Sequence, residues 1–121
     1  MAVLVFFVWG AFSASLDRAI DAAAKAGDPA PALAAIAKRS PDAQPTAYNH
    51  AIRRLWDAYE RQIAARLVCE LGHHHDSSKI TQYWIQQVMS TEPAIAREAF
   101  SEDFLSAHYQ PEVAATCGKV G

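Results

Sequence analysis

The chain has 121 residues, a length that fits one independently folding domain. A hydrophobic fraction of 51% beside 20% charged residues is typical of a globular protein and excludes a disordered chain. The formal net charge of -2 offers no basic face to a phosphate backbone, so nucleic acid is not the expected partner.

The first sixteen residues form an apolar segment unlike the rest of the chain. They read MAVLVFFVWGAFSASL, and no charged side chain precedes Asp17. The apolar run is shorter than the roughly 20 residues that a membrane-spanning helix needs, but it fits the apolar core of a signal peptide. Small residues follow it, and they suit cleavage before Ala14 or Leu16. We therefore predict a signal peptide over residues 1–15, and the alternative is that this segment belongs to the mature fold.

The remaining residues, 16–121, are expected to form a single helical domain in the periplasm or outside the cell. The two cysteines, Cys69 and Cys117, fit that compartment, because exported proteins keep disulfides. A bridge closing a loop of this length adds about 4 kcal/mol in the chain-entropy model. We predict that the two cysteines are bridged, and the alternative is two unrelated thiols.

Two short helices are expected first. Leu16–Ala26 is rich in alanine, with apolar residues at helical spacing, and Gly27 suits the left-handed position that often ends a helix. Ala30–Arg39 has its cations in the last turn, where the helix dipole favours them. The two segments together predict a helical hairpin.

One long amphipathic helix is expected next, over about Ala47–Leu71, with Thr46 as its N-cap. Its apolar residues recur every three or four positions and its charged residues occupy the opposite face. The apolar stripe consists of Tyr48, Ile52, Leu55, Tyr59 and Ile63. The opposite, solvent-exposed face consists of Arg53, Arg54, Asp57 and Arg61.

The stretch ELGHHHDSSK follows this helix and contains three consecutive histidines, His73, His74 and His75. Imidazole is a good ligand for zinc and copper, so a metal site using this triplet is one hypothesis. Adjacent positions on an extended loop do not converge on one ion, however. Gly72 suits the end of one helix, and Asp76 or Ser77 the start of the next. We therefore predict a solvated linker, with metal binding or pH sensing as alternatives.

The last two helices are expected over about Ser77–Ser90 and from Thr91 onwards, the latter with Pro93 in its first turn and Pro111 beyond its end. No run after the apolar segment alternates with the period of a strand. The fold class predicted is all-α: a small bundle of about five helices after a cleavable N-terminal apolar segment.

Five aromatic residues of the middle helices are candidates for a binding face or the lining of a cavity: Tyr48, Trp56, Tyr59, Tyr83 and Trp84. The competing interpretation is that they fill the core, since a domain this small needs its large side chains for burial.

No motif for catalysis or phosphate binding occurs, so no cofactor is predicted and an enzyme is not favoured. The expected function is that of a small exported helical protein that binds another protein, as an inhibitor, immunity or accessory factor. The mature chain is expected to bind no nucleic acid and to contain no stable membrane span. Alternatives are a metal-binding protein using the loop from His73 to His75, and a small helical enzyme with an unrecognised site.

Overall fold

A computed structural model describes the backbone of residues 2–75 and 79–100, and the side chains of residues 14–75 and 79–100. The described residues form six α-helices and no β-strand. The helices are α1 (Ala2–Ala26), α2 (Ala30–Ala37), α3 (Gln44–Asp57), α4 (Arg61–His74), α5 (Lys79–Thr91) and α6 (Pro93–Ala99). The predicted small all-α bundle is therefore confirmed, with six helices described where about five were expected.

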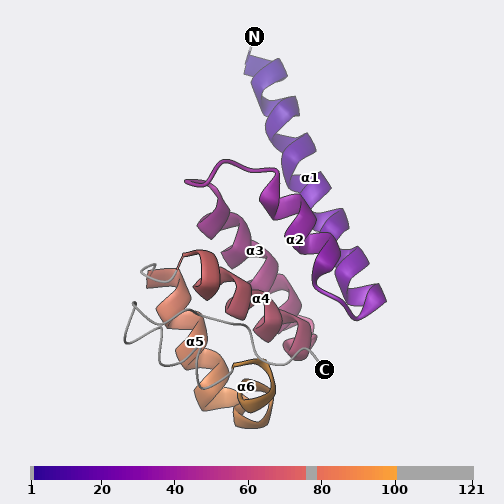
Figure 1. Cartoon of the computed structure of the whole chain (residues 1–121). Helices are drawn as coiled ribbons and strands as arrows, with labels where there is room; N and C mark the ends of the chain where they lie inside the picture. Colours follow the sequence, from indigo (N-terminus) through magenta and orange to yellow (C-terminus); the bar gives the residue numbers. More distant parts are fainter. Residues whose placement is uncertain (1, 76–78, 101–121) are drawn as a thin grey trace.

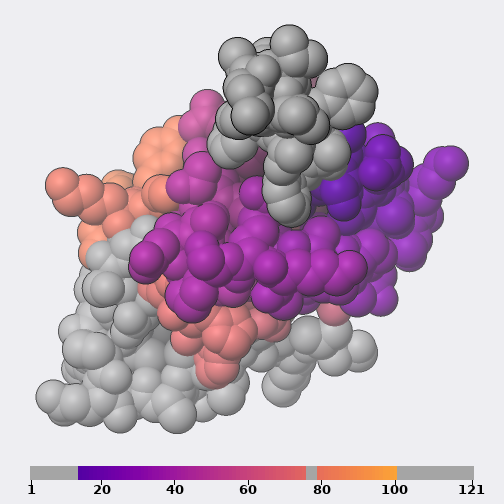
Figure 2. Space-filling view, turned by 90° about the horizontal axis from the view of Figure 1, so that it is seen from above, coloured from indigo at the N-terminus to yellow at the C-terminus, as the bar shows by residue number. Residues whose placement is uncertain are grey.

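Helices α3 and α4 form the centre of the bundle (Figure 1). α3 contacts α1 and α2 on one side, and α4 contacts α5 and α6 on the other. The view from above shows α2 lying across the middle, with α1 to its right and α5 to its left (Figure 2). The largest fully buried side chains come from α1 to α5 and include Ile20, Ile36, Ile52, Leu67 and Val88. No helix in the described part of the chain is long and apolar enough to cross a membrane.

Among the residues of helix α1 whose side chains are described, those from Leu16 onwards contribute to this core. Leu16, Ile20 and Ala23 are 4%, 2% and 0% exposed, whereas Ala14 and Ser15 are exposed. The helix ends as predicted at Gly27, which has a φ of 65°. The N–H of Gly27 donates to the carbonyl of Ala24 and that of Asp28 to the carbonyl of Ala23, as in a Schellman motif.

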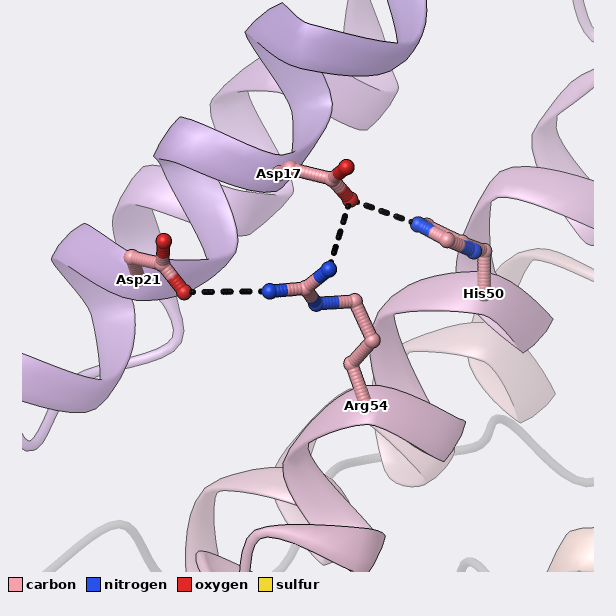
Figure 3. A network of polar contacts seen from close by, with 4 residues as sticks. All are labelled: Asp17, Asp21, His50 and Arg54. Carbon is pink, nitrogen blue, oxygen red and sulfur yellow. Dashed lines mark hydrogen bonds and ion pairs between the residues drawn. The ribbon is translucent and has the colours of Figure 1, made fainter.

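Polar contacts on the surface add to the packing of α1 on α3 (Figure 3). Asp17 accepts from His50, whose Nε2 lies 2.7 Å from its Oδ1, and its carboxylate is also 3.5 Å from Arg54. The guanidinium of Arg54 lies between the two carboxylates and reaches Asp21 at 3.4 Å. Because these groups are exposed, each pair contributes at most about 1 kcal/mol, and the buried face does most to hold α1 in place.

The prediction of one long helix over Ala47–Leu71 is wrong, because the chain turns between α3 and α4. Tyr59 has a φ of 62°, the left-handed conformation that L residues avoid. Its N–H donates to the carbonyl of Trp56 and the N–H of Glu60 to the carbonyl of Leu55. This is the Schellman pattern of Gly27 again, with a tyrosine in the position that glycine usually occupies.

The predicted end of a helix at Gly72 is also wrong. Gly72 is buried inside α4, which continues through His73 and His74. His75 follows as the C-cap, with its N–H donating to the carbonyl of Leu71 at 2.7 Å. Asp76 and Ser77, the predicted caps of the next helix, lie outside the described residues. α6 begins at Pro93 as expected, and the prediction for the chain from residue 101 on also falls outside the described part.

Candidate functional site

Tyr59 is the most exposed large hydrophobic side chain of the described residues. It is 79% exposed, although it lies in a turn whose backbone conformation disfavours any residue with a Cβ. Glycine would fit this turn at lower conformational cost, so nothing in the folding of the corner itself calls for a tyrosine. An exposed aromatic residue held in a strained conformation points to a functional role.

Arg61 fixes the position of this tyrosine from the first turn of α4. Its guanidinium carbon lies 4.8 Å from the ring centroid of Tyr59 and 4.5 Å from that of Trp56, so the cation contacts both rings. Its Nη1 donates to Glu92, between α5 and α6, at 2.8 Å. Its Nε is buried and has no hydrogen-bond partner among the described residues. The side chain of Arg61 on α4 therefore contacts three other segments: α3, the turn at Tyr59 and the junction of α5 and α6.

Two further aromatic residues extend this group across α5. The ring centroids of Trp56 and Trp84 are 5.9 Å apart and those of Trp84 and Tyr83 are 5.2 Å apart, all edge to face. Trp84 is buried, and its indole N–H donates to Asn49 of α3 at 2.8 Å, which fixes the ring. Tyr83 beside it is 49% exposed.

We refer to Trp56, Tyr59, Arg61, Tyr83 and Trp84, together with Arg53, as the aromatic–arginine surface. Arg53 lies 6.0 Å from the ring centroid of Trp84 and forms no ion pair with any described residue. Its two tryptophans are buried (Trp84) and half-buried (Trp56), its two tyrosines are exposed, and its two cations are arginines. Four of the five aromatic residues predicted for a binding face are thus brought together.

Tyr48, the fifth, lies elsewhere. It is 4% exposed, and its ring packs edge to face against His75, at 6.3 Å between centroids. Burial, with a smaller effect of the negative charge of Glu70, raises the pKa of Tyr48 to about 12. The hydroxyl therefore stays protonated in the folded protein at any physiological pH.

The three histidines face different neighbours. The rings of His73 and His74 lie edge to face, 4.9 Å between centroids, and Nε2 of His74 is 3.7 Å from Glu70. Nε2 of His75 is 3.3 Å from the side-chain oxygen of Gln44. No group of three or more His, Cys, Asp and Glu side chains within the described ranges is placed to hold a metal ion.

The predicted disulfide involves one residue that is described. Cys69 is buried in α4, 1% exposed, and faces the core of the bundle. Cys117 lies outside the described residues. The bridge therefore stays a prediction.

Comparison with known proteins gives no relative: no protein family, no curated protein and no solved structure matches this chain. The candidate site therefore rests on the chemistry and geometry of its own residues.

Proposed function

We propose that this chain is a small exported, disulfide-bonded helical protein that acts, without catalysis, by binding another protein through the aromatic–arginine surface. The observation that carries the proposal is Tyr59, exposed to 79% in a left-handed turn where glycine would fit better. Tyrosine, tryptophan and arginine are the residues that most often dominate the energy of a protein interface.

The surface is well suited to a protein partner for a second reason, because its side chains are already ordered. Arg61 is held between two rings and an ion pair, and Trp84 by its bond to Asn49. Binding to ordered side chains loses less conformational entropy, so more of the contact energy appears as affinity.

The charges of the surface indicate what the partner presents. Arg53 is exposed and has no carboxylate partner among the described residues, so its guanidinium can pair with a carboxylate of another molecule. We therefore propose a partner segment that places an Asp or Glu beside apolar side chains. Single-stranded nucleic acid also stacks on aromatic residues, but it needs a groove of cations. Here Asp57 and Glu60 lie close in sequence to the two arginines, and Arg61 is already paired with Glu92.

A partner search in extracts of the native host tests this proposal. The immobilised chain is compared with Tyr59→Gly and Arg53→Glu, and bound proteins are quantified by mass spectrometry. Loss of one hot-spot side chain costs about 2 kcal/mol, which predicts that a specific partner is retained at least about tenfold less by each variant.

Two substitutions outside the surface serve as controls. Met89→Ser removes another exposed apolar side chain, and Arg97→Glu reverses another exposed charge on α6. Both controls should retain the partner at the level of the unaltered chain. A partner that is lost equally from the controls, or retained by both surface variants, would show that binding does not use this surface.

A further inference from the structure

A hollow of about 380 Å³ lies between α2, the first turns of α3 and the last turns of α4, and none of its lining residues belongs to the aromatic–arginine surface. Leu33, Ile36 and Ala37 of α2 give it an apolar wall. Gln44, Tyr48, Glu70 and His74 give it a polar one. Its volume is at the lower end of the range of ligand pockets and equals roughly a dozen water molecules.

The polar wall is held in place by its own hydrogen bonds. The side-chain nitrogen of Gln44 donates to the carbonyl of Arg39 at 3.0 Å, and its oxygen lies 3.3 Å from Nε2 of His75. The ring of Tyr48 is fixed by its edge-to-face contact with His75. The hollow therefore has a defined shape, because its amide and its tyrosine are both tied to neighbouring elements.

Among the described residues of the lining, the only carboxylate is that of Glu70, whose side chain is 33% exposed. Its one ion-pair partner among the described residues is His74, at 3.7 Å, which is longer than a hydrogen bond and charged only when the imidazole is protonated. Glu70 lines the hollow together with Tyr48, and its negative charge adds to the effect of burial in raising the pKa of that tyrosine. A cation there would gain the attraction of this carboxylate.

We propose that this hollow binds a small primary ammonium compound with an apolar tail, the ammonium at Glu70 and the tail against Leu33 and Ile36. The ammonium supplies the donors that a carboxylate requires when water is displaced from it. The hydroxyl oxygen of Tyr48, which stays protonated and uncharged, is a second acceptor on the same wall. An anionic ligand is disfavoured by Glu70, and a purely apolar one would displace water from its carboxylate and leave it only the 3.7 Å contact with His74.

Hexylamine is a suitable probe, since it combines one ammonium with an unbranched tail. Amide NMR spectra of the full chain at neutral pH should show saturable shifts centred on the lining residues. Hexanol has the same tail without charge, and ammonium chloride the charge without a tail. Each should bind at least about tenfold more weakly than hexylamine, because a hydrogen bond to a charged group and the burial of the tail each contribute this much.

Two variants test the assignment of the two walls. Glu70→Gln keeps the size of the side chain and should weaken hexylamine about tenfold, whereas Glu98→Gln, on the exposed side of α6, should leave it unchanged. Ala37→Phe should fill the hollow and abolish binding, and Ala34→Phe, on the same helix outside the lining, should not.

Equal binding of hexylamine and hexanol, or undiminished binding to Glu70→Gln, would overturn the proposal. The same applies if saturable shifts are absent from the lining residues at millimolar hexylamine. None of these results bears on the aromatic–arginine surface, which shares no residue with the hollow.

Discussion

Replacing Tyr59 with glycine should leave the protein about as stable as before, whereas replacing it with alanine should destabilise it. In the left-handed conformation a residue with a Cβ is strained by about 1–2 kcal/mol, and glycine is not. Glycine loses about 0.5–1 kcal/mol more backbone entropy on folding, which offsets part of that gain. Both variants lose the contact with Arg61, worth about 0.5 kcal/mol at an exposed site.

The difference between the two variants is therefore the sharper quantity. Tyr59→Gly should exceed Tyr59→Ala by about 1 kcal/mol in the free energy of unfolding, or by about 4 °C in melting temperature. Urea unfolding followed by circular dichroism measures the first and a thermal scan the second. A matched pair at Asp57, in the last turn of α3, should give the opposite order, because alanine is preferred to glycine inside a helix.

If glycine proves no better than alanine at position 59, the left-handed turn does not carry the strain that we ascribe to it. The argument that Tyr59 is kept there for binding would then lose its basis. If the order is as expected and the glycine variant loses the partner, stability and binding are separated at one residue.

Three further predictions concern Tyr48 and the ends of the chain. Because the pKa of Tyr48 is raised to about 12 in the folded protein, the folded state holds this proton more tightly than the unfolded state. Stability is unaffected by this group below about pH 10 and falls by roughly 2–3 kcal/mol as the pH rises towards 12. Tyr48→Phe should lose this part of the alkaline destabilisation, and the absorbance titration of the unaltered chain should show one tyrosine ionising last. A Tyr48 that ionises together with the exposed tyrosines would contradict its burial. Peptide mapping without reduction should recover Cys69 linked to Cys117, and native thiols that react fully with an alkylating reagent would exclude the bridge. Protein from the native host should begin at Ala14 or Leu16, since the described core of α1 begins at Leu16 and either cut leaves it whole; intact Met1 in the cytoplasm would rule out export.

Local signals in the sequence predict three features of the fold: its helical class, the end of α1 at Gly27 and the start of α6 at Pro93. The turn at Tyr59 has the same hydrogen bonds as that at Gly27 but no glycine to mark it. Apolar residues recur at helical spacing on both sides of the turn at Tyr59, so periodicity alone predicts one helix across it. The error at Gly72 is the opposite one. This glycine predicts the end of a helix, but it is buried inside α4 and the helix continues past it.

The candidate site could be predicted only in part for the same reason. The aromatic residues are identifiable by type, but the sequence pattern places Arg61 on the solvated face of a straight helix. On such a helix residues five positions apart do not face each other, and only the turn brings Arg61 over Trp56. The contact between Trp56 and Trp84 depends on how α3 and α5 each pack against α4, which no local pattern contains. Tyr48 belongs to the same apolar stripe in the sequence, but in the structure it packs against His75 and not against the other aromatic residues.

The pair of Arg61 and Glu92 has a consequence for any molecule that binds at the corner. Glu92 joins α5 to α6 and accepts from Arg61 at 2.8 Å, so one guanidinium belongs both to the aromatic–arginine surface and to the junction of the last two described helices. A partner that contacts Arg61 in its present position would also favour its ion pair with Glu92 at this junction. By thermodynamic linkage the effect is reciprocal: the factor by which a bound partner favours the contact of Arg61 with Glu92 is the factor by which that contact raises the affinity for the partner.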